Sequence, residues 1–89
     1  MIMEKQVKAT CHRSLSSWDR TGCGVVHFYA GETYLFNVCE KVEGSFIYKE
    51  YSISLPQEGI IGNPTREVHF FDRHFKYSYF FADYFRINL

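Results

Sequence analysis

The chain has 89 residues, of which 46% are hydrophobic and 19% are aromatic, and this length predicts one small globular domain without a second core. Its ten Lys and Arg residues equal its ten Asp and Glu residues, so net charge gives no reason to expect binding to nucleic acid or an anionic membrane. No apolar run approaches the roughly 20 residues that span a bilayer, and the first ten residues lack the apolar stretch of a signal peptide. We therefore expect a cytoplasmic protein with no membrane partner and with reduced cysteines.

Alternation of apolar and polar residues with a period of two predicts β-strands along most of the chain. In the first of them, Val7, Ala9 and Cys11 fall on one side of the strand, and Lys8 and Thr10 on the other. The predicted strands cover residues 6–12, 25–29, 33–40, 46–55 and 66–71.

The segments between these strands have the composition of turns and loops. Residues 13–24 are rich in Ser and Gly, and we expect a long loop there with Trp18 as an anchor. Shorter turns are predicted at 30–32 and 42–45. Pro56 ends a strand because proline cannot donate to a sheet ladder, and a Gly- and Pro-containing connection follows it.

The last 21 residues, 69–89, contain nine aromatic side chains and support two conflicting patterns. Read as a strand, alternate residues from Tyr77 onward share one side, interrupted by Asp83. Read as a helix, Phe81 and Phe85 are one turn apart. We favour one or two short helical turns around residues 78–85, followed by a brief edge strand in residues 86–89.

About five short strands without a long amphipathic helix predict a mainly β fold, a small antiparallel barrel with one short helical turn near the C-terminus. A barrel also removes the exposed edges that so aromatic a sheet would otherwise present.

Two short motifs, Gly31-Glu32-Thr33-Tyr34 and Phe81-Ala82-Asp83-Tyr84-Phe85, resemble those of a group of small phage and prophage accessory proteins with SH3-like β-barrel cores. The resemblance implies a single SH3-like domain over residues 1–89. It also implies a protein that acts in the cytoplasm of the host cell by binding a host protein, such as a component of a defence or regulatory system. Since fold alone does not determine function, these are expectations.

Metal-dependent or thiol-dependent chemistry has little support in the sequence. The cysteines and histidines supply zinc-ligand types, but no two cysteines have the C-x-x-C spacing of structural zinc sites. Cys23, between two glycines, is the best candidate for a reactive thiol, but no base that would activate it can be located. We expect a non-enzymatic protein without a metal or other cofactor, in which Cys11 and Cys39 are core residues. The residues considered are Cys11, His12, Cys23, His27, Cys39, His69 and His74.

Binding of single-stranded nucleic acid is the main alternative to protein binding. The C-terminal segment interleaves cations with rings, the combination that neutralises phosphates and stacks bases. Asp72 and Asp83 and the neutral chain argue against it. The residues concerned are Arg73, His74, Lys76, Tyr77, Tyr79, Phe80 and Arg86.

Protein binding is the function that we favour from the sequence, because there are more rings than a small core needs. Phe71, Phe75, Phe81 and Phe85 are expected to seal the barrel end, whereas other rings fall on the polar side of their strands. Such exposed rings are typical of interfaces, and a second copy of the chain is the simplest partner. The predicted contact residues are Trp18, Arg73, Lys76, Tyr77, Tyr79 and Phe80.

Overall fold

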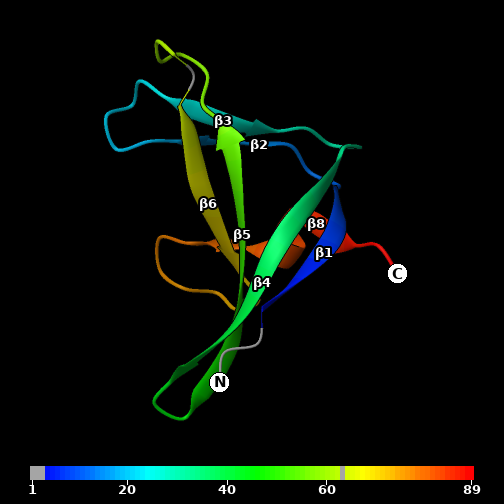
Figure 1. Ribbon diagram of the computed structural model, residues 1–89. Helices are drawn as coiled ribbons and strands as arrows, with labels where there is room; N and C mark the ends of the chain where they lie inside the picture. The colour runs from blue at the N-terminus through cyan, green and yellow to red at the C-terminus, as the bar shows by residue number, and fades with distance from the viewer. Residues whose placement is uncertain (1–3, 63) are drawn as a thin grey trace.

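A computed structural model describes residues 4–62 and 64–89. Across these residues the chain forms eight strands and one 3-10 turn, which confirms the mainly β prediction (Figure 1). Five strands and a brief edge strand were expected; β8 corresponds to that edge strand, whereas β2 and β7 are short additional strands that were not predicted. The elements are β1 (Glu4–Cys11), β2 (Leu15–Trp18), β3 (Val25–Phe28), β4 (Thr33–Glu43), β5 (Phe46–Pro56), β6 (Thr65–Phe71), β7 (Tyr79–Phe80), η1 (Phe81–Asp83) and β8 (Phe85–Ile87).

Six strands form one curled sheet in the order β7-β6-β5-β4-β1-β8. Neighbours pair antiparallel except β6 and β7, which are parallel. The C-terminal segment supplies both edges of this sheet, since β7 lies beside β6, β8 lies beside β1, and η1 connects them. Residues 79–87 therefore cross from one edge to the other and close the open side of the half-barrel. The predicted helical turn is present but is shorter than expected, and none of the described helical residues forms a span that could cross a membrane.

The region predicted as a long loop contains β2, which pairs with β3 in a separate two-stranded sheet. The hydrophobic pattern conceals this strand because its buried central residue is Ser17 rather than an apolar side chain. Arg66 on β6 donates to the carbonyl oxygen of Ser17, which offsets the cost of burying that polar backbone group. The prediction of a loop at 15–18 is therefore wrong.

The core lies between the concave face of the curled sheet and the β2–β3 hairpin. Alternate residues of each long strand point inward, as their period predicts. Phe36, Phe70 and Phe85 meet edge to face, with ring centroids 4.8 to 5.8 Å apart, a favourable geometry for aromatic pairs. Phe81 and Phe85 are buried in this core, on the inner side of the half-barrel. The buried cluster comprises Ala9, Cys11, Val26, Phe28, Phe36, Val38, Tyr51, Ile53, Val68, Phe70, Phe81 and Phe85.

Candidate functional site

A second group of rings lies on the outer face of the sheet, away from the core. Tyr48 on β5 and Phe71 on β6 point outward, and Phe75 from the segment after β6 packs against both. Ring centroids are 6.0 Å apart for Tyr48 and Phe71, 5.0 Å for Tyr48 and Phe75, and 5.2 Å for Phe71 and Phe75. Phe46 points outward on the same strand, two residues before Tyr48. We call Phe46, Tyr48, Phe71 and Phe75 the outer aromatic cluster.

The expectation that Phe71 and Phe75 seal the barrel end is therefore wrong. Phe70 is fully buried, and the pleat of the strand turns the next residue, Phe71, to the opposite face. Phe75 follows Phe71 to this face because the chain folds back over the sheet after β6.

The segment 72–78, between β6 and β7, is attached to the sheet at its beginning. The Asp72 N–H donates to the Lys49 carbonyl at 3.1 Å, and the Lys49 N–H donates to Asp72 Oδ1 at 3.0 Å. Further along, His74 stacks on Phe80 with ring centroids 4.0 Å apart. The Ser78 N–H donates to the Phe75 carbonyl at 3.2 Å and closes a turn. These contacts hold the segment against the outer aromatic cluster.

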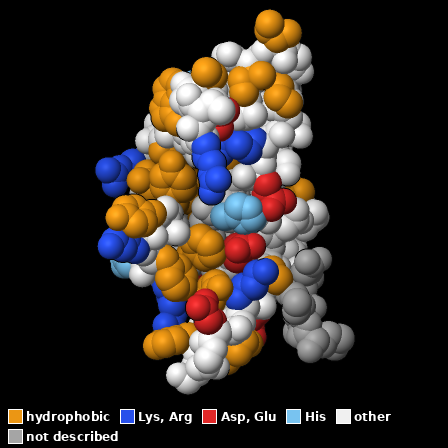
Figure 2. Space-filling view, turned by 90° about the vertical axis from the view of Figure 1, so that its left-hand side faces the viewer, with side chains coloured by type: hydrophobic (Ala, Val, Ile, Leu, Met, Phe, Trp, Pro, Cys, Tyr) orange, Lys and Arg blue, Asp and Glu red, His pale blue; other side chains and the backbone are white. Residues whose placement is uncertain are grey.

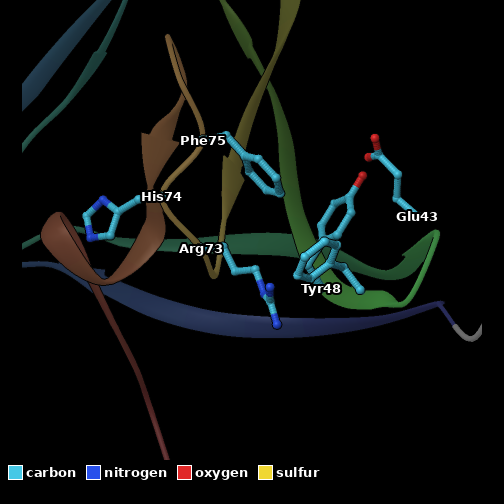
Figure 3. A pocket seen from close by; sticks show the side chains of 6 residues that line it. Glu43, Tyr48, Arg73, His74 and Phe75 are labelled. Atoms are coloured by element: carbon cyan, nitrogen blue, oxygen red, sulfur yellow. The ribbon is translucent and has the colours of Figure 1, made fainter.

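A hollow of about 280 Å³ lies over this cluster, between the β4–β5 hairpin and segment 72–78. Glu43 pairs directly with Phe46 in the hairpin register, so both side chains leave the same face. The Arg73 guanidinium carbon lies 5.2 Å from the centroid of the Phe46 ring, within the range of a cation–π interaction. Figure 3 shows Glu43 and Arg73 on opposite sides of the rings, with His74 pointing away from them. The lining residues are Glu43, Phe46, Tyr48, Arg73, His74 and Phe75.

The charged side chains around the hollow have no ion-pair partner among the side chains that the structure describes. All ion pairs among those side chains involve His27 or His69, so Glu43, Arg73 and Lys76 take part in none of them. Figure 2, which faces the side where segment 72–78 projects in Figure 1, shows hydrophobic side chains interspersed with Lys and Arg. An apolar surface with unpaired charges of both signs can bind a partner by burial and by charge complementarity.

Three of the six predicted contact residues, Arg73, Lys76 and Tyr77, lie on segment 72–78, and Phe80 lies on β7 directly after it. Tyr77 is 94% exposed, and the Lys76 ammonium lies 5.2 Å from its ring centroid. Phe80 is half-buried through its stack on His74. Trp18 is 59% exposed, but it lies at the end of β2, on a different element from the cluster.

Tyr79 contradicts the expectation that its ring lies on the polar side of its strand, outside the core. Its ring centroid lies 5.4 Å from that of Phe70 and 5.9 Å from that of Tyr84, and it packs against the core. Tyr79 lies on the two-residue strand β7, directly before the 3-10 turn η1, and its ring points toward the core. Of the residues that line the hollow, Glu43, Phe46, Tyr48 and Phe75 were not among the predicted contact residues. The sequence did contain a signal for an apolar outer surface: the predicted strand at residues 46–55 carries large apolar side chains on both of its faces.

The cysteines differ in their surroundings. Cys11 is buried, its thiol donates to the Arg13 carbonyl at 3.1 Å, and burial raises the pKa of this thiol, which agrees with a core role. Cys39 is only half-buried. It lies opposite Glu50 in the register of β4 and β5, on the outer face of the sheet, so the prediction that it is a core residue is wrong. Cys23 is exposed. No group of three or more metal-ligating side chains occurs in the part of the chain that the structure describes.

Comparisons with protein-family models, with curated proteins and with solved structures find no match to this chain.

Proposed function

We propose that the protein is a non-enzymatic, SH3-like protein-binding domain that docks its partner on the outer aromatic cluster. The observation that carries this proposal is the exposed hollow of Phe46, Tyr48 and Phe75. It is flanked by Glu43 and Arg73, which have no ion-pair partner among the described side chains. Aromatic and Arg side chains provide most of the binding energy in protein interfaces when they become desolvated there.

The rings of this surface are held in place before a partner arrives. Segment 72–78 is hydrogen-bonded to β5 through Asp72 and Lys49, and the rings of Tyr48, Phe71 and Phe75 contact one another. Binding to such a surface costs little ordering of side chains, which favours affinity.

The partner that we propose is a host protein. A curled sheet closed by a 3-10 turn before the last strand is compatible with the SH3-like barrel of the phage and prophage proteins that the two motifs resemble. In that setting the domain would act in the host cytoplasm by covering or redirecting a defence or regulatory protein.

Single-stranded nucleic acid is the competing candidate, because Arg73 and Lys76 lie beside exposed rings. Glu43 at the hollow and Asp72 at the start of the segment would repel phosphates there. The two candidates differ in salt dependence, since binding through phosphates weakens steeply as salt rises.

The experiment is affinity capture from host-cell lysate with the 89-residue chain and two variants. Phe46→Ser combined with Arg73→Ser removes an exposed ring and an exposed cation from the hollow. Ile61→Ser removes an equally apolar, fully exposed side chain elsewhere. We expect the wild type and the Ile61→Ser variant to retain one stoichiometric host protein, and the double variant to lose it. Equal recovery by all three, or a mobility shift of single-stranded DNA that disappears with salt, would contradict the proposal.

A further inference from the structure

Tyr77 combines two features that are rare together. Its side chain is 94% exposed, and it is the one non-glycine residue with positive φ, +64°, among those that the structure describes. Left-handed backbone is unfavourable for a bulky residue, and such strain persists mainly where the surroundings impose it, often at binding sites. Here the Ser78-to-Phe75 hydrogen bond closes the turn around Tyr77. The turn therefore projects an aromatic ring into solvent.

The projecting ring and part of the hollow's lining come from the same short segment, 72–78. Arg73 and Phe75 line the hollow, and Tyr77 follows two residues later in the same segment. When a ring and a receiving hollow adjoin on one surface, a two-fold axis can place each ring against the hollow of the other copy.

The charges also match for such a pairing. Lys76 lies beside the ring of Tyr77, whereas Glu43 lines the hollow, and neither has an ion-pair partner among the described residues. A ring that enters the hollow of a second copy brings a cation toward a carboxylate. Opposite charges that meet reciprocally fix the register of a two-fold interface.

We propose that two copies of this chain associate through this surface, each inserting Tyr77 into the hollow of the other with Lys76 beside Glu43 of the second copy. The proposal rests on the proposed function, because it uses the same surface. Self-association and docking of a host protein then exclude each other, so the dimer is a resting form that the partner must displace.

Sedimentation velocity of the 89-residue chain over a concentration series tests this dimer. We expect a reversible equilibrium between the 10.6 kDa monomer and a dimer, weakened at least about tenfold by Tyr77→Gly, since loss of a buried interfacial Tyr has a large effect. Glu43→Lys and Lys76→Glu should each weaken the dimer, and the double variant should restore it. Tyr29→Ala, at an exposed Tyr outside this surface, should leave it unchanged.

Three results would overturn the proposal: a monomer at every concentration, a dimer insensitive to Tyr77→Gly, or a charge-exchanged double variant that stays monomeric. Thermal unfolding of each variant establishes that the fold is intact. If the chain is monomeric while capture of the host protein still depends on Phe46 and Arg73, self-association is excluded and the docking surface stands. If the dimer forms but no host protein is captured, the proposed function fails instead.

Discussion

Phe70 and Phe71 illustrate how a single step along a strand separates structural from functional rings. Phe70 is fully buried and contacts Phe28 and Phe36 in the core. Phe71 contacts Tyr48 and Phe75 on the outer face. Residue type is the same at both positions, and only the pleat distinguishes them. A surplus of aromatic residues was visible in the sequence, but the members of the outer group depend on where segment 72–78 folds.

Replacing Tyr77 with Gly should not destabilise the fold and should stabilise it by up to about 1 kcal/mol. The left-handed backbone costs an L-residue about 1–2 kcal/mol, whereas glycine adopts it freely but loses more entropy on folding. Lys76 is an exposed neighbour without positive φ, so Lys76→Gly should instead cost about 0.5–1 kcal/mol. Urea unfolding at concentrations where the chain is monomeric measures both. Equal losses of stability in the two variants would show that position 77 carries no strain.

The β2–β3 hairpin is the element whose placement depends most on one side chain. Arg66 on β6 donates from Nε to Gln57 Oε1 at 2.8 Å and from its guanidinium to the Ser17 carbonyl. Ser17 and Gln57 are both buried. A backbone bridge between Val25 and Glu58 adds a second attachment. Arg66 therefore connects the hairpin, the segment after β5 and the main sheet.

Arg66→Met should lower the free energy of unfolding by about 2–3 kcal/mol, because it leaves buried acceptors on Ser17 and Gln57 without a donor. Methionine preserves much of the aliphatic stem, so the loss reports mainly on hydrogen bonding. Arg86 is exposed on β8, and Arg86→Met should change stability by less than about 0.5 kcal/mol. Chemical denaturation compares the two variants. Similar small effects at both positions would mean that the Arg66 contacts do not hold the hairpin.

At the scale of elements, the sequence predicted the long strands and the short strands β3 and β8, but not β2 and β7. Residues 6–12, 33–40, 46–55 and 66–71 alternate over several residues, and each contains or overlaps an observed strand. β2 was missed because its buried residue is a serine whose donor, Arg66, lies 49 positions away. The C-terminal segment was ambiguous because Phe81 and Phe85 satisfy both periods, and the structure uses strand, 3-10 turn and strand in succession.

For the whole molecule, the sequence predicted a mainly β domain with an aromatic core and rings outside that core. The inward positions of Ala9, Phe36 and Tyr51 followed from alternation alone. The candidate site was only partly predictable, because the hollow is formed by two segments about 30 residues apart, 43–48 and 73–75, and no local pattern reports their contact. Arg73 was predicted as a contact residue, but its position over Phe46 depends on the tertiary fold.

Site-specific photo-crosslinking in host cells tests most directly whether the outer aromatic cluster is the docking surface. A benzoylphenylalanine side chain placed at Phe46, within the hollow, is compared with the same side chain at Ile61, which is more exposed and lies outside it. We predict a discrete crosslinked protein product from position 46, resistant to nuclease, and none from position 61. Crosslinking from position 61 alone, or a nuclease-sensitive product from position 46, would contradict the account.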